Sequence, residues 1–113
     1  MMSDGFTVVG MEKLQKKLTN NVNLKAVKDV VRMNGSELQD KSMRNAPVDT
    51  GTLKRSIGLE IVDGGLTAVV EPTVEYAPYV ELGTRFMDPQ PYLKPAFEKQ
   101  SKQFRKDMGK LVR

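Results

Sequence analysis

The sequence predicts an α+β fold, in which a small antiparallel sheet packs against a long helix and a C-terminal helix. Two observations lead to this prediction. Apolar residues recur at helical spacing in two segments, about 24–46 and about 93–112, and they alternate in a hairpin-like segment between them, about 56–71. The chain has 113 residues, of which 39% are hydrophobic, so we expect one domain spanning residues 1–113.

Two shorter segments come before the long helix. Residues 6–9 are β-prone and are followed by Gly10, which breaks the strand pattern. Met11, Leu14 and Leu18 then follow at helical spacing, and we expect a short helix there.

The long helix is predicted over residues 24–46. Its apolar positions include Val27, Val31 and Leu38, and Gly35 interrupts the pattern. A glycine inside a helix costs about 1 kcal/mol relative to alanine, so we expect Gly35 to permit either a kink or a close contact. Pro47 ends the helix, because the residue before a proline is pushed out of the helical region.

The hairpin is predicted from alternation and from its turn. Ile57, Leu59 and Ile61 alternate with other residues along the first strand, and residues 66–71 form the returning strand. Residues 63–65 read Asp-Gly-Gly, which favours a tight turn because glycine accepts positive φ. A lone hairpin is marginally stable, so we expect a third strand from residues 6–9, from the stretch near Val74, or from another subunit.

The last part of the chain is predicted to be helical. Residues 76–82 form one or two helical turns that Gly83 ends, and Pro91 and Pro95 lie near the start of the final helix. An apolar seam runs along that helix: Phe97, Ser101, Phe104, Met108 and Leu111. We expect this seam to pack on the sheet, and docking on a neighbouring subunit is the alternative.

The composition argues against an enzyme. The chain has no histidine and no cysteine, so it lacks the side chain best suited to proton transfer near neutral pH and the commonest metal ligand. We expect no catalytic residue, no metal and no cofactor. No apolar run reaches 18 residues and no secretion signal is evident, so we expect no membrane association.

One tripeptide requires a specific test. Asp49-Thr50-Gly51 matches the active-site triplet of retroviral-type aspartic proteases, in which two aspartates share a proton. Here it follows a long helix and a proline, and the nearly all-β context of those proteases is missing. We therefore interpret Asp49 as the cap of a short turn that runs to Ser56.

The charges are unevenly placed along the chain. Residues 57–89 contain six acidic residues and one basic residue, whereas residues 94–113 contain seven basic and two acidic residues. Patches of opposite sign can steer head-to-tail association of copies, which closes a ring when the rotation is right. The candidate interface residues are Glu71, Glu75, Glu81, Arg85, Lys99, Lys102, Arg105 and Lys106.

Nucleic-acid binding through the basic C-terminal helix is the alternative function. Clustered lysines and arginines bind phosphates without reading sequence. However, no helix-turn-helix, zinc-finger or RNA-recognition pattern is present, and the aromatic residues do not alternate with basic ones as in a base-stacking platform.

Three segments together resemble a bacteriophage tail-component family of siphophage neck proteins, related to the Z-type minor tail proteins of lambda-like phages. The first segment, residues 46–57, reads APVDTGTLKRSI. The second, residues 76–84, reads YAPYVELGT, and the third, residues 90–96, reads QPYLKPA. They occur in the order and at the spacing of the family pattern.

The resemblance implies a structural protein of the virion, assembled in the bacterial host cytoplasm. It implies a place at the head–tail junction, a role in tail completion and head–tail joining, and other neck and tail proteins as partners. A homo-oligomeric ring, most simply a hexamer, would match the sixfold tail tube, and the basic helix would allow non-specific contact with DNA in the tail channel.

Under this resemblance most motif residues are architectural. Tyr76, Tyr79 and Val80 would pack the short helix, and Glu81 would meet a basic side chain of its own chain or of a neighbour. The motif residues are Pro47, Asp49, Thr50, Gly51, Leu53, Ser56, Tyr76, Ala77, Tyr79, Val80, Glu81, Gly83, Thr84, Pro91 and Pro95.

Overall fold

A computed structural model describes residues 6–9, 23–47 and 51–111. Its elements are strand β1 (Phe6–Val9), helix α2 (Leu24–Asn45), helix α3 (Gly51–Ser56), strand β2 (Gly58–Val62), the 3-10 turn η1 (Asp63–Gly65), strand β3 (Thr67–Glu71), helix α4 (Ala77–Leu82) and helix α5 (Leu93–Leu111). The predicted α+β class is confirmed. The predicted short helix at residues 11–18 lies outside the described residues.

The sheet has three antiparallel strands in the order β1-β3-β2. Val70 pairs with Leu59 on one side and with Phe6 on the other. The third strand predicted from residues 6–9 is therefore present and makes β3 the central strand. In the turn, Asp63, Gly64 and Gly65 all have positive φ, and Thr67 Oγ1 donates to Asp63 Oδ2 at 2.7 Å.

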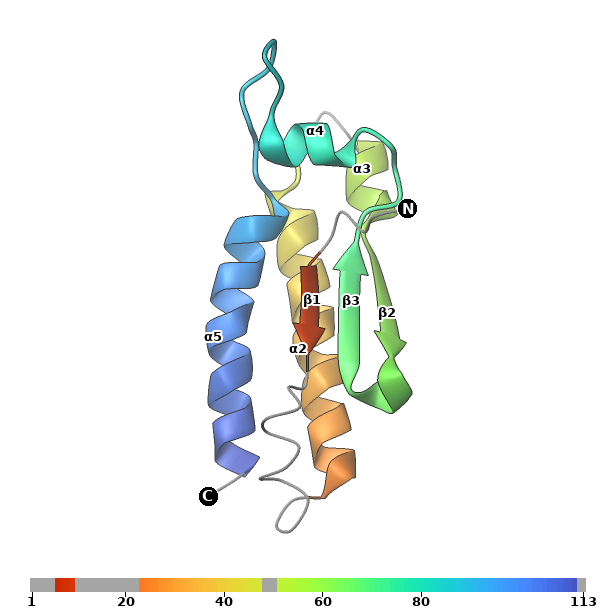
Figure 1. Cartoon of the computed structure of the whole chain (residues 1–113), viewed down its shortest axis with the longest axis vertical. Coiled ribbons are helices and arrows are strands. Elements are labelled where there is room, and N and C mark those ends of the chain that lie inside the picture. The colour runs from red at the N-terminus through yellow and green to blue at the C-terminus, as the bar shows by residue number, and fades with distance from the viewer. Residues whose placement is uncertain (1–5, 10–22, 48–50, 112–113) are drawn as a thin grey trace.

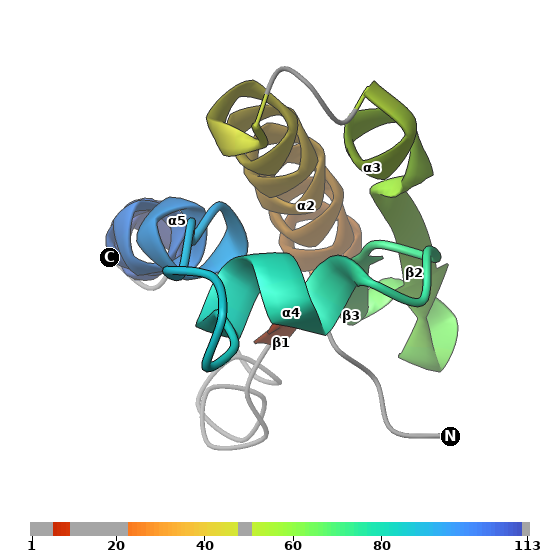
Figure 2. The ribbon, with the colours of Figure 1, turned by 90° about the horizontal axis from the view of Figure 1, so that it is seen from above.

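The two long helices differ in what they pack against. Helix α2 packs on β2 and β3, whereas α5 runs antiparallel to α2 and lies beside it (Figure 1). Seen from above, α4 runs from beside α5 across β1 toward β3, and α3 lies next to the start of β2 (Figure 2). The core between these layers includes Val27, Val31, Leu38, Ala68, Val70, Leu93, Phe104 and Met108.

Helix α2 approaches the sheet closely at Gly35. A Cβ atom built on Gly35 would lie 2.6 Å from Ala68 Cβ and 3.0 Å from Leu59 Cδ1. The structure thus selects the close contact as the reason for this glycine.

The expected packing of α5 needs a correction. Phe104 and Met108 are buried as predicted, but α5 packs mainly along α2, and its main contact with the sheet is with the edge strand β1. The buried face is centred on Leu93, Ala96 and Gln100 rather than on the Ser101 side of the seam. Gln100 is fully buried because it belongs to a hydrogen-bonded polar cluster, a feature that apolar periodicity does not reveal.

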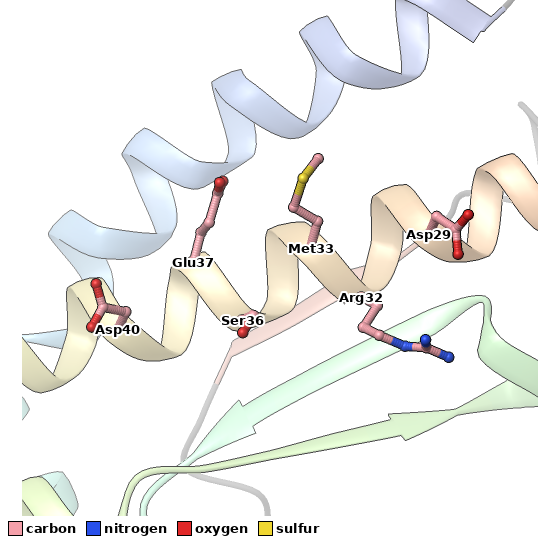
Figure 3. A pocket seen from close by; sticks show the side chains of 6 residues that line it. All are labelled: Asp29, Arg32, Met33, Ser36, Glu37 and Asp40. Atoms are coloured by element: carbon pink, nitrogen blue, oxygen red, sulfur yellow. The ribbon is translucent and has the colours of Figure 1, made fainter.

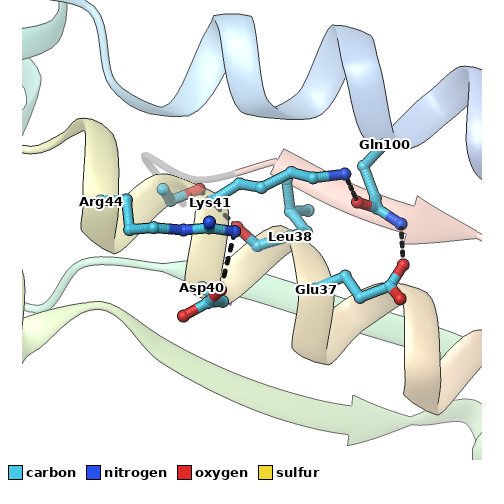
Figure 4. A network of polar contacts seen from close by, with 7 residues as sticks. Glu37, Leu38, Asp40, Lys41, Arg44 and Gln100 are labelled. Atoms are coloured by element: carbon cyan, nitrogen blue, oxygen red, sulfur yellow. Dashed lines mark hydrogen bonds and ion pairs between the residues drawn. The ribbon is translucent and has the colours of Figure 1, made fainter.

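This polar cluster lies between α2 and α5. Gln100 Nε2 donates to Glu37 Oε1, and Lys41 Nζ donates to Gln100 Oε1 (Figure 4). Gln100 Nε2 also donates to Asn34 Oδ1. Asn34 Nδ2 in turn donates to Asp107 Oδ2 at 3.0 Å. Because such bonds require particular side chains to face each other, the cluster fixes how α5 is placed along α2.

Candidate interaction surface

Glu81 joins two segments that sequence reasoning treated as separate motifs. It lies in the last turn of α4 and is only 9% exposed. Its Oε1 atom accepts the backbone N–H groups of Tyr92 at 3.1 Å and Leu93 at 2.8 Å, and its Oε2 atom accepts that of Lys94 at 3.1 Å. One carboxylate therefore caps the start of α5.

The cap explains how the free backbone N–H groups at the start of α5 are satisfied. The first N–H groups of a helix have no partner within the helix. Three of them bond to Glu81, and the next residue, Pro95, has no N–H to satisfy. The negative charge also faces the positive end of the helix dipole. Pro91 and Pro95 flank the helix start as predicted.

Within its own chain, Glu81 meets no basic side chain among the described residues. Its partners are three backbone amides, and it is nearly buried. A contact with a basic side chain of a neighbouring copy stays a prediction. The sequence did contain a hint. Tyr92 stands at the helix start, where serine, threonine, aspartate or asparagine usually caps the helix, so the cap had to come from elsewhere in the chain.

Residues 83–91 form a loop that projects beyond α4 at one end of the molecule (Figure 1). Gly83 has φ 77°, and a Cβ atom there would lie 2.7 Å from Pro89 N. Thr84 and Met87 pair as an isolated antiparallel bridge, and Thr84 Oγ1 accepts the Phe86 N–H at 3.1 Å. Gly83 and Thr84 therefore shape this loop.

Large apolar side chains are exposed on α4 and on this loop. Phe86 is 89% exposed, Leu82 75% and Tyr79 57%. Such exposure costs solvation free energy, and concentrated apolar exposure marks a binding surface. We call this set the apical surface; its members are Tyr76, Tyr79, Leu82, Phe86 and Met87.

The apical surface corrects two predicted roles. Tyr76 and Tyr79 do not pack α4 into the core but lie on its outer side, whereas Ala77 and Val80 are buried as expected. In a helix of six residues only about half of the side chains can face the protein. Phe86 and Met87 were not predicted, although two adjacent large apolar residues within a loop are themselves a sign of binding.

The first motif, residues 46–57, has a structural role where the structure describes it. Leu53 is fully buried in α3, Ile57 is 2% exposed, and Ser56 Oγ donates to Leu53 O at 2.8 Å. Pro47 follows α2, whose last flanking residue, Ala46, has the extended ψ of 142° that a following proline favours. Gly51 begins α3. The predicted cap at Asp49, and Thr50 beside it, lie outside the described residues.

The basic candidates share one face of α5. Six basic side chains of α5 are exposed, and none forms an ion pair with the residues that the structure describes. These side chains are Lys94, Lys99, Lys102, Arg105, Lys106 and Lys110. The acidic candidates do not form a matching surface, because Glu75 is exposed, Glu71 is half-buried and Glu81 is buried.

Within the described part of the chain, no group of three or more acidic, histidine or cysteine side chains is placed to hold a metal ion. The described helices also include none that is long and apolar enough to cross a membrane.

A hydrogen-bonded framework that holds an exposed apolar end is typical of a subunit that assembles with other proteins. A family model described as "Bacteriophage HK97-gp10, putative tail-component" matches residues 11–83. The chain therefore belongs to this HK97-gp10-like family of bacteriophage tail components. The predicted phage tail-component identity is confirmed, and the family is a structural one rather than an enzyme family.

The match covers the first motif and nearly all of the second, and it ends at Gly83. The third motif and α5 lie beyond it. No curated protein and no solved structure matches the chain.

Proposed function

We propose that this protein is a structural subunit of the head–tail junction, or neck, of a tailed bacteriophage or prophage. It acts in tail completion and head–tail joining through protein–protein contacts. The apical surface is the observation that carries this proposal, because a loop that exposes Phe86 at 89% is explained by a partner that covers it. Membership of a tail-component family supports other phage tail proteins as these partners.

We further propose that copies of the chain form a ring in the virion, most simply a hexamer, and that the ring assembles in the host cytoplasm. A ring of identical subunits needs two different surfaces on each copy. The apical surface is one of them. The basic face of α5 is free to lie near the DNA of the tail channel, where it would contact phosphates without sequence preference.

Deletion of the gene from the phage tests the neck role. We expect DNA-filled heads and separate tails to accumulate, since neither part would be defective by itself, and we expect a copy supplied in trans to restore joined particles. Electron microscopy of lysates distinguishes the outcomes. Particles that remain joined and infectious, or tails of abnormal length on joined heads, would contradict a neck function.

Nucleic-acid binding remains the alternative, favoured by the six unpaired basic side chains on α5. If phosphate binding were the function, affinity for duplex DNA would fall steeply with salt, and replacing Lys102 and Lys106 with glutamate would abolish it. A gel shift at low salt measures this. Absence of binding by the unaltered chain would exclude the alternative.

A further inference from the structure

We propose that the loop carrying Arg85 and Phe86 docks into a groove on helix α2 of a neighbouring copy. This inference rests on the proposed function, since it names the two surfaces through which copies of the subunit would meet. It is carried by the shape and charge of two regions on different parts of the chain.

The first region is a preformed projection. Arg85 Cζ lies 5.2 Å from the centroid of the Phe86 ring, so the guanidinium and the ring form one cation–π unit. No carboxylate among the described residues pairs with Arg85. The loop is held by the Thr84–Met87 bridge and by Gln90 N–H donating to Val80 O at 2.8 Å. Little conformational entropy would therefore be lost when the loop binds.

The second region is an open groove of about 540 Å³ along the outward face of α2. Figure 3 shows the six lining side chains on successive turns of the helix. They are Asp29, Arg32, Met33, Ser36, Glu37 and Asp40.

The groove provides both an apolar contact for Phe86 and carboxylates for Arg85. Met33 is 49% exposed and provides an apolar contact for the Phe86 ring, to which a thioether sulfur is well suited. Among the described residues, three carboxylates and one guanidinium line the groove, a balance of −2. Asp40 pairs with Arg44 and Glu37 accepts from Gln100, whereas Asp29 forms no ion pair with the described residues. Asp29 is therefore the best partner for Arg85.

The two regions cannot meet within one molecule. The loop projects from the end where α4 lies, whereas the groove runs along α2 (Figures 1 and 3). A contact between two different surfaces of identical copies is heterologous, so it propagates from copy to copy and closes as a ring when the rotation between copies is right. This is the type of contact that a ring-shaped neck component requires.

Disulfide trapping tests the contact, because the natural chain has no cysteine. Two single-cysteine chains are mixed and oxidised at low salt: Asp88→Cys in the loop, and Ser36→Cys in the groove of a second chain that carries a mass tag. Both positions are exposed. We expect the 88–36 heterodimer to exceed both homodimers severalfold, because a disulfide forms only between Cα atoms about 4.4–6.8 Å apart.

A matched control places the cysteine on the basic helix. Lys102→Cys is exposed on α5 and is mixed with the same Ser36→Cys chain. We expect this pair to cross-link only at the level of the homodimers. A 102–36 product in excess of the 88–36 product would identify α5 as the occupant of the groove and overturn the inference, as would an 88–36 product no more abundant than the homodimers.

Charge reversal provides a second readout that does not depend on the cysteine geometry. Arg85→Glu in the loop chain should lower the 88–36 yield about twofold to fivefold, as expected for a partly exposed ion pair. Asp29→Lys in the groove chain should restore it. Lack of rescue would reject the pairing of Arg85 with Asp29.

The outcomes separate this inference from the neck function. If trapping fails while gene deletion still blocks head–tail joining, the docking inference is wrong and the neck role stands. If trapping succeeds while the deletion leaves joined particles, the contact stands and the neck role is wrong.

Discussion

At the scale of single residues, Glu81 has the clearest structural role. Its carboxylate accepts three backbone N–H groups at the start of α5 while it is almost completely buried. Glu81→Gln keeps the size but presents an NH2 group to backbone donors. We expect the free energy of unfolding in urea to fall by about 2 kcal/mol, since buried donors would lose a charged acceptor.

Glu75→Gln is the matched control, because Glu75 is exposed in the segment before α4. We expect it to change stability by no more than about 0.5 kcal/mol. If the two substitutions had equal effects, the capping role of Glu81 would be rejected.

Two helical glycines should respond to alanine in opposite directions. At Gly35 the new methyl group would lie 2.6 Å from Ala68 Cβ, so Gly35→Ala should destabilise the fold by about 1–3 kcal/mol through overpacking. At Gly109 the new group would meet nothing among the described residues within 4 Å beyond its chain neighbours and the backbone of its own helix, so Gly109→Ala should stabilise α5 by up to about 1 kcal/mol. Urea unfolding of both variants measures the signs, and a stabilising Gly35→Ala would contradict the close approach of α2 to the sheet.

These residues also show how far the sequence alone can lead. The end of the long helix at Pro47 and the tight turn at Asp63–Gly65 were predictable, because each depends only on neighbouring residues in the sequence. The cap from Glu81 was not, because its partners are 11 to 13 residues away and are backbone groups. The exposure of Tyr79 depends on which side of α4 faces the protein. A helix of six residues is too short for its apolar pattern to indicate that side.

At the scale of elements, α2 and α5 are joined through a buried polar cluster as well as apolar contacts. Gln100 and Asn34 are both fully buried and bonded to each other at 2.6 Å. Gln100→Leu should cost about 2 kcal/mol, because Asn34 Oδ1 would lose its donor in a buried site.

The double variant Asn34→Leu with Gln100→Leu should cost less than the sum of the two single changes, since both partners of the bond are then removed together. A double-mutant cycle from urea unfolding measures this coupling. Strict additivity would mean that the bond does not hold the two helices together.

The elements themselves were largely predictable. Helix α2 and the hairpin agree with their periodicity to within about two residues, because amphipathic spacing over many residues is a strong signal. The packing of α5 was predicted only in part: α5 contacts the sheet at β1, but its main partner is α2. Its apolar seam indicated burial, but the choice between the sheet and α2 depends on Gln100 and its partners, which read as polar and therefore as exposed.

At the scale of the whole molecule, stability and function should be separable at the apical surface. Leu82→Ser with Phe86→Ser removes two side chains that are 75% and 89% exposed. We expect the free energy of unfolding to change by no more than about 0.5 kcal/mol, and the gene to lose its ability to complement a deletion. Loss of complementation caused by unfolding, detected in the same urea measurement, would contradict a purely interfacial role.

The central claim is that this tail component is located at the neck. The end of α5 lies at the opposite end of the molecule from the apical loop, so a C-terminal tag would be remote from the apical surface (Figure 1). Phage particles carrying such a tag can be labelled with gold and imaged by electron microscopy. The account predicts gold at the junction between head and tail on most labelled particles. Gold along the tail tube, at the distal tail end, or only on free protein would contradict it.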